Sequence, residues 1–163
     1  MKFMGTLIAV TDLDKSRKFY RDILGLTITT DHGPNVTFNG CIVLQTMDSW
    51  IEVIKSQYVM FDNRASELYF ETEDFDNLIL RLDTFGIEYV HRPIMRHWGQ
   101  RVVRLFDPDH HIIEVGESIV TVMRRFAAEG MNIEQIAERM KLHPDFVRNC
   151  LEEKGDKGEK NAV

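Results

Sequence analysis

The spacing of apolar residues predicts the same order of elements twice along the chain. Two short β-type runs, residues 7–10 and 67–71, each pass through an aspartate into a segment with helical spacing. In the second copy, apolar residues recur three or four positions apart after Asp74, which is a natural N-cap. Glycines at Gly25 and Gly86 close the two helical segments. Each copy therefore begins as a strand followed by a helix.

Three further strand candidates follow each predicted helix, with turn-forming Gly, Pro, Asn and Asp residues between them. The strand candidates span residues 26–30, 36–38 and 41–46 in the first copy and 88–92, 102–106 and 112–115 in the second. This order predicts an α+β fold made of two βαβββ modules, over about residues 3–46 and 67–116. A chance similarity between short patterns is the alternative to a true repeat.

The pattern becomes purely helical after Gly116. Three helices are expected there, the second starting at Asn132, which forms a capping-box pattern with Gln135, and the third at Pro144. The charged, glycine-containing end of the chain predicts disorder. We therefore expect a domain over residues 1–117, a helical extension over residues 118–153 and a disordered tail over residues 154–163.

Composition and charge narrow the class of protein. The 163 residues are 44% hydrophobic and 28% charged, which is typical of a folded globular protein. The net charge of −6 argues against a broad nucleic-acid surface. The uncharged run over residues 3–11 is too short to span a bilayer, and Cys41 and Cys150 lack the spacing of a metal site or disulfide framework. We expect a cytoplasmic protein without membrane or nucleic-acid partners.

Several short motifs resemble those of the vicinal-oxygen-chelate superfamily, which includes glyoxalase I, bleomycin resistance proteins and extradiol dioxygenases. The motifs lie in residues 10–16, 19–20 and 24–25 of the first half and in residues 70–74, 98–101 and 106–114 of the second. The most specific of them is the D-P-D-x-x-x-x-E sequence from Asp107 to Glu114. The resemblance covers about residues 3–117. It implies paired βαβββ modules whose sheets curl around a central cavity, and it implies a homodimer.

The resemblance also implies four metal-ligand positions, occupied by His and Glu in metal-dependent members. Here they fall on Gly5, Gln45, Glu67 and Glu114, and Glu114 alone matches. A divalent metal held by Glu114, Glu67 and the Gln45 carbonyl is one hypothesis. Mg²⁺ or Mn²⁺ is favoured over Ni²⁺, Co²⁺ or Zn²⁺, because hard cations prefer oxygen ligands. The missing ligand at Gly5 and the neutral, weaker ligand at Gln45 count against glyoxalase I activity itself.

Two other interpretations of Glu67 and Glu114 stay open. If the carboxylates approach each other, one pKa rises and the pair can act as general acid and base without a metal. In the structural alternative, Glu114 forms an ion pair with Arg101 or Arg104, while Glu67 meets solvent at a strand end. The catalytic candidates are therefore Glu114, as metal ligand or base, and Glu67 opposite it.

Candidate ligand-binding residues lie beside the His97-Trp98-Gly99-Gln100 sequence, which resembles a family loop at the cavity mouth. Trp98 can stack on a flat ligand, and Gln100 or Arg101 can bind its polar groups. Tyr69 and Trp50 are further aromatic candidates for the cavity wall. The alternative is a structural turn in which Trp98 plugs the sheet. No glycine-rich phosphate loop occurs, so no nucleotide cofactor is expected.

The helical extension has the spacing of a helix-turn-helix, with a short turn around His143. Residues 117–163 contain 8 Lys or Arg and 9 Asp or Glu residues, a net charge of −1. A DNA-reading helix normally carries a basic footprint, so the apolar faces more simply pack on the main domain or across a dimer.

Three functions follow from these observations. The first is binding of a small organic molecule in the sheet cavity, with lyase or isomerase chemistry through an enediolate if the protein is an enzyme. The second is a non-catalytic protein that sequesters a drug or metabolite. The third and weakest is a ligand-sensing regulator that uses the helical extension.

Overall fold

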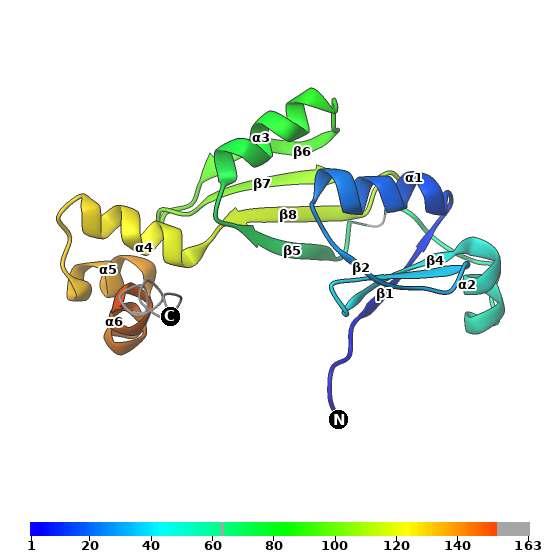
Figure 1. Cartoon of the computed structure of the whole chain (residues 1–163), viewed down its shortest axis with the longest axis horizontal. Helices are drawn as coiled ribbons and strands as arrows, with labels where there is room; N and C mark the ends of the chain where they lie inside the picture. The colour runs from blue at the N-terminus through cyan, green and yellow to red at the C-terminus, as the bar shows by residue number, and fades with distance from the viewer. Residues whose placement is uncertain (63, 153–163) are drawn as a thin grey trace, which may run out of the picture. The chain divides into compact units, whose positions relative to one another are not determined.

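A computed structural model describes residues 1–62 and 64–152 of the chain (Figure 1). These residues divide into two compact units, each described by itself below. The first unit contains Met1–Leu68, Asp76–Val90 and Arg104–Ile113, and the second contains Tyr69–Phe75, His91–Val103 and the chain from Glu114 onward. The disordered tail predicted over residues 154–163 lies outside the described residues.

The first βαβββ module forms a four-stranded mixed sheet in the order β1-β4-β3-β2. Its elements are β1 (Thr6–Val10), α1 (Leu13–Lys18), the π-helical turn η1 (Phe19–Ile23), β2 (Ile28–Asp31), β3 (Asn35–Phe38), β4 (Ile42–Thr46) and the following helix α2 (Met47–Ile54). Strand β1 runs parallel to β4, whereas the other pairs are antiparallel. The buried side chains include those of Tyr20, Phe38 and Leu44. The single helix expected before Gly25 is an α-helical turn that continues as a π-helical one.

The second module repeats this arrangement in the order β5-β8-β7-β6 (Figure 1). Its elements are β5 (Glu67–Thr72), α3 (Phe75–Thr84), β6 (Tyr89–Met95), β7 (Arg101–Phe106) and β8 (Ile112–Glu117). In both modules the first and last strands are neighbours, and the helix follows the first strand. The predicted α+β fold with two βαβββ modules is therefore confirmed.

The Asp107-Pro108-Asp109 turn anchors α1 within the first unit. Asp107 is buried and accepts hydrogen bonds from the Tyr20 hydroxyl (3.0 Å) and from the backbone N–H of His111 (2.8 Å). Asp109 accepts hydrogen bonds from the backbone and hydroxyl of Thr11 and from the Ser16 hydroxyl. Because each carboxylate satisfies several donors, the turn fixes where α1 begins.

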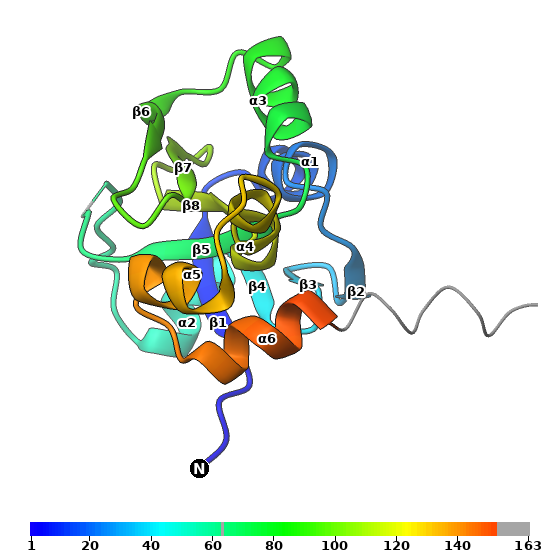
Figure 2. The same ribbon diagram turned by 90° about the vertical axis from the view of Figure 1, so that its left-hand side faces the viewer.

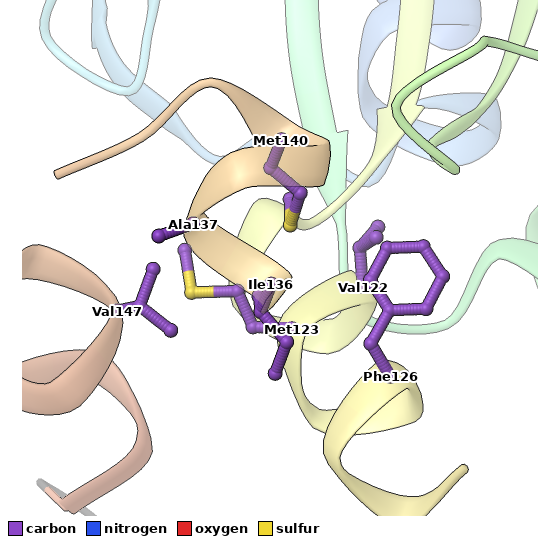
Figure 3. Close-up of a cluster of buried hydrophobic side chains, with 7 residues drawn as sticks. All are labelled: Val122, Met123, Phe126, Ile136, Ala137, Met140 and Val147. Carbon is purple, nitrogen blue, oxygen red and sulfur yellow. The ribbon is translucent and has the colours of Figure 1, made fainter. Parts of the chain in front are cut away.

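Three helices follow the second module, as predicted: α4 (Ile119–Ala128), α5 (Ile133–Met140) and α6 (Pro144–Glu152). Figure 2 shows them grouped around one another. The predicted capping box is present, since Asn132 Oδ1 accepts from the Gln135 backbone and Gln135 Oε1 accepts from the Asn132 backbone, both at 2.9 Å. Their common core consists of Val122, Met123, Phe126, Ile136, Ala137, Met140 and Val147 (Figure 3). Among the described residues, no helix has the length and apolar character needed to cross a membrane.

Candidate functional site

A chain of polar and aromatic contacts connects five side chains of the second unit. We call Tyr69, Arg96, Trp98, Gln100 and Glu114 the Trp98 cluster. The indole N–H of Trp98 donates to Gln100 Oε1 (3.1 Å), and Gln100 Nε2 donates to the Tyr69 hydroxyl (2.9 Å). Arg96 lies over the Trp98 ring, 5.8 Å from its centroid, and its Nη2 is 3.4 Å from Glu114 Oε2. The structure thus joins four of the sequence candidates and adds Arg96.

The loop between β6 and β7 places Arg96, Trp98 and Gln100. It is closed by two backbone hydrogen bonds of 2.8 Å, from Arg96 N to Gln100 O and from Gly99 N to Arg96 O. Gly99 has a φ of +91°, a conformation that side-chain-bearing residues rarely adopt. The tight turn therefore requires glycine at this position, and it directs Trp98 and Gln100 from a short, fixed segment.

Gln100 is the buried centre of the cluster, only 3% exposed. Its Nε2 donates to the Glu117 backbone oxygen (2.9 Å) as well as to Tyr69, so its orientation is fixed by three hydrogen bonds including that from Trp98. Gly116 leaves room for this arrangement, because a Cβ there would lie 2.6 Å from Gln100 Nε2 and 2.9 Å from the Tyr69 hydroxyl oxygen. The role of Gln100 is therefore to position its neighbours.

Tyr69 is a hydrogen-bond donor that keeps its proton. Its hydroxyl donates to Glu71 Oε1 at 2.8 Å. Partial burial raises the pKa of Tyr69 to about 12; the Gln100 hydrogen bond opposes this rise, and the carboxylates of Glu71 and Glu114 add to it. At neutral pH the phenol is therefore not a base.

Arg96 carries a buried donor that the described part of the chain leaves without an acceptor. Its Nε is buried and has no hydrogen-bond partner, and its guanidinium otherwise meets Glu114 and the Trp98 ring. An unsatisfied buried donor costs about 1–3 kcal/mol. An acceptor oxygen placed beside Arg96 and Trp98 would remove that cost.

Arg101, a predicted ligand-binding residue, is held by Glu117. Its Nη2 lies 3.1 Å from Glu117 Oε1, and its guanidinium lies over the Phe75 ring, 4.9 Å from the centroid. Arg125 of α4 approaches the other carboxylate oxygen at 3.0 Å. Burial alone would raise the pKa of Glu117, but the hydrogen bonds and charges of Arg101 and Arg125 lower it below its usual value. Arg101, together with Arg125, therefore stabilises the charge of the buried Glu117 carboxylate.

Two of the four positions that the resemblance assigns to metal ligands are occupied by Gly5 and Gln45, neither of which is a His or Glu residue. A Cβ at Gly5 would lie 2.3 Å from the backbone oxygen of Cys41, so no side chain fits there. The Gln45 amide nitrogen donates to Ser49 Oγ at 2.8 Å. Among residues 1–62 and 64–152, no group of three or more His, Cys, Asp or Glu residues could hold a metal. We derive no step through a metal, and the divalent-metal hypothesis stays a prediction.

The two candidate carboxylates each have an arginine partner. Glu67 accepts from Arg104 Nε at 2.7 Å and from Arg104 Nη2 at 3.3 Å, within the first unit. Glu114 is 8% exposed and pairs with Arg96 in the second. Arg96 was not among the arginines expected near Glu114, and the hairpin loop brings it to β8. Glu67 is exposed at the first residue of β5, and it also has an arginine partner.

The remaining sequence candidates, Gln45 and Trp50, belong to the first unit. Trp50 is half-buried on α2. That unit also has a cavity of about 610 Å³ beside α1, lined partly by Phe19, Phe85 and Phe106. No predicted site residue lines it. The sequence reasoning missed Arg96, Glu117 and Arg125, because nothing in the local spacing marks an arginine as a partner of a distant strand.

Comparison with known proteins gives consistent results. Residues 3–120 match the family described as Glyoxalase-like domain. The chain is 29% identical over 129 residues to the uncharacterized protein YraH of Bacillus subtilis (strain 168), covering 71% of this chain and 97% of that protein.

Two solved structures from Agrobacterium tumefaciens are also similar. A protein of unknown function shares 38% sequence identity with a TM-score of 0.67, covering 72% of this chain and 94% of that one. A lactoylglutathione lyase shares 23% identity with a TM-score of 0.56, covering 72% and 93%, which indicates a shared fold alone. The family match ends two residues into α4, so Arg125 and Phe126 lie beyond it.

Proposed function

Because the chain belongs to the glyoxalase-like domain family, we propose that it binds a small planar organic molecule through carbonyl or carboxylate oxygens at the Trp98 cluster. The protein is glyoxalase/bleomycin resistance/dioxygenase-like, and this proposal adds the chemistry of the ligand. The binding residues are Arg96 for the oxygens and Trp98 for the ring, with Gln100 and Tyr69 as positioning residues.

The observation that carries the proposal is the buried Nε of Arg96 without an acceptor. A guanidinium offers several donors in one plane and suits a carboxylate or a pair of vicinal oxygens. Glu114 lies 3.4 Å from Nη2, a long contact that does not involve Nε. A ligand oxygen at Nε would satisfy a group that the fold otherwise buries at a cost.

Trp98 supports the planar character of the ligand. Its indole N–H is already bonded to Gln100, so it offers a ligand only its aromatic surface. Aromatic rings and guanidinium groups together favour flat, electron-rich molecules with an acidic substituent. Arg96 and Trp98 lie close together, with the guanidinium 5.8 Å from the ring centroid, so one small molecule can contact both.

The Glu114–Arg96 pair supports a second candidate, enediolate chemistry. In such a reaction the Glu114 carboxylate removes a proton from a hydroxyl-bearing carbon next to a substrate carbonyl. The electron pair of that C–H bond then forms the C=C bond, and the negative charge that develops on the carbonyl oxygen is stabilised by Arg96. Glu114 is 8% exposed, so bulk water competes little for its charge.

Binding is tested with phenylpyruvate, which has a ring, a keto group and a carboxylate, and with phenethylamine as a ligand lacking acceptor oxygens. The Trp98 indole NMR signal, identified in Trp50→Phe protein, reports binding. We expect Arg96→Met to weaken phenylpyruvate binding by about tenfold or more, because a charge-assisted hydrogen bond contributes about 1.5–3 kcal/mol. Arg92→Met, at an exposed arginine of β6, the strand that precedes the loop, is the control.

Two outcomes contradict the proposal. One is equal binding of phenylpyruvate and phenethylamine, and the other is equal affinity of the wild type and Arg96→Met. Catalysis is examined separately, by exchange of the phenylpyruvate CH₂ protons for deuterium above the buffer rate. Loss of that exchange in Glu114→Gln, with binding retained, supports Glu114 as the base; absence of exchange in the wild type favours the non-catalytic binding protein.

A further inference from the structure

We propose that the three-helix extension, α4–α6, positions the loop that carries Trp98, and that Phe126 and Arg125 are the residues through which it does so. The inference rests on the proposed function for its biological meaning, since the loop is where we place the ligand. It concerns residues beyond the family match, which ends at residue 120. The extension would then set ligand affinity from outside the glyoxalase-like region.

The Phe126 ring packs against the backbone of the loop at Gly99. A Cβ at Gly99 would lie 2.2 Å from Phe126 Cζ and 2.9 Å from Phe126 Cε2, so the ring contacts the loop backbone directly. The same ring is 1% exposed and belongs to the core of the extension (Figure 3). One side chain therefore takes part both in the helical core and in the shape of the loop.

Arg125 holds the loop by hydrogen bonds. Its Nη2 donates to the backbone oxygen of Gly99 at 2.7 Å and to Glu117 Oε2 at 3.0 Å. The backbone oxygen of Glu117 in turn accepts from Gln100 at 2.9 Å. The loop is thus connected to Arg125 of α4 directly through the Gly99 carbonyl and indirectly through Gln100 and Glu117.

Helix α5 completes the support. The guanidinium of Arg139 lies over the Phe126 ring, 4.4 Å from the centroid. Packed interiors rearrange between discrete states more readily than they deform gradually. The position of the Phe126 ring, and with it the Gly99 backbone, therefore depends on whether the extension is folded.

The experiment uses the full-length protein labelled with ¹⁵N and follows the two indole N–H signals, assigned with Trp50→Phe and Trp98→Phe. We expect Arg125→Met to shift or broaden the Trp98 signal and to leave the Trp50 signal in place. Arg124→Met, the same change at the neighbouring residue of α4, should leave both signals unchanged. Phenylpyruvate affinity should fall in Arg125→Met by about tenfold, as expected for loss of a charged hydrogen bond.

A second test uses Phe126→Leu, with Ile136→Val in the same hydrophobic core as its control. Both should lower the melting temperature, but only Phe126→Leu should move the Trp98 signal, because Ile136 belongs to α5 and acts within the helical core. An unchanged Trp98 signal in both Arg125→Met and Phe126→Leu overturns the inference. The NMR readout needs no ligand, so a failure of phenylpyruvate to bind contradicts the proposed function and leaves this result standing.

Discussion

The most deeply buried carboxylates of the two units, Asp107 in the first and Glu117 in the second, have different partners. In the first unit the Asp107 carboxylate accepts hydrogen bonds from the Tyr20 hydroxyl and from backbone N–H groups, and it contacts the imidazole of His111. In the second unit Glu117 forms ion pairs with the guanidinium groups of Arg101 and Arg125. Asp107 thus binds mainly neutral donors close to it in sequence, whereas Glu117 depends on charges.

This difference predicts that the two units respond differently when the buried carboxylate loses its charge. Neutral hydrogen bonds to a buried carboxylate tolerate loss of the charge, because an amide oxygen can still accept them. A carboxylate between two guanidinium groups cannot lose its charge without leaving like charges close together. Charge removal should therefore harm the second unit more than the first.

The largest expected effect is that of Glu117→Gln. Breaking a buried ion pair costs about 3–5 kcal/mol, and we expect about 2–3 kcal/mol here because the two arginine side chains are each 32% exposed and recover part of their hydration. Urea denaturation measures the loss, with Glu134→Gln on the exposed face of α5 as the control. A loss as small as that of the control would contradict the ionic role of Glu117.

Asp107→Asn should have a smaller effect, of about 1–2 kcal/mol, because its Oδ1 can still accept from the backbone of Asp109 and His111. The same urea experiment tests it, with Asp76→Asn on α3 as an exposed control. If Asp107→Asn proved more destabilising than Glu117→Gln, the comparison between the two units would be reversed.

The pH dependence of stability separates the two carboxylates further. Burial lowers the pKa of His111, but the hydrogen bond and charge of Asp107 raise it more, so the net shift is upward. The contribution of His111 is therefore complete below its unfolded pKa of about 6.5 and is lost as pH rises through the folded value. We expect His111→Asn to be destabilising at pH 6 and closer to neutral at pH 9, measured as the difference in unfolding free energy.

Glu117 should respond in the opposite direction. Its pKa is lowered in the folded protein, so its contribution is present above the unfolded value and is lost as pH falls through the folded one. The destabilisation caused by Glu117→Gln should therefore shrink below about pH 4.5. A pH-independent effect of either substitution would mean that folding does not shift the pKa of the replaced group.

The smallest expected effect is that of added metal, since the two predicted carboxylate ligands each have an arginine partner, Arg104 for Glu67 and Arg96 for Glu114. We expect calorimetric titration of metal-stripped protein with Mg²⁺, Mn²⁺, Ni²⁺, Co²⁺ and Zn²⁺ to show no saturable binding near one ion per chain. Saturable binding that is abolished by Glu114→Gln would instead establish a metal centre at this carboxylate.

The repeated modules and the capping box at Asn132 follow from the sequence by itself. Apolar periodicity, N-caps and turn residues act over a few positions, so the elements they specify can be read without knowing the rest of the fold. The Asp107-Pro108-Asp109 motif was also recognisable, because a turn of this composition forms locally. The family resemblance rested on such local features, and it was confirmed.

The tertiary structure alone decided which charges meet. The loop brings Arg96 to Glu114, a partner that sequence spacing did not indicate, and Arg101 pairs with Glu117. The contact of Arg125 with the Gly99 carbonyl joins residues 26 positions apart on different elements. Such pairs depend on strand neighbours and helix docking, which arise from the burial of many side chains together and have no signature in local spacing.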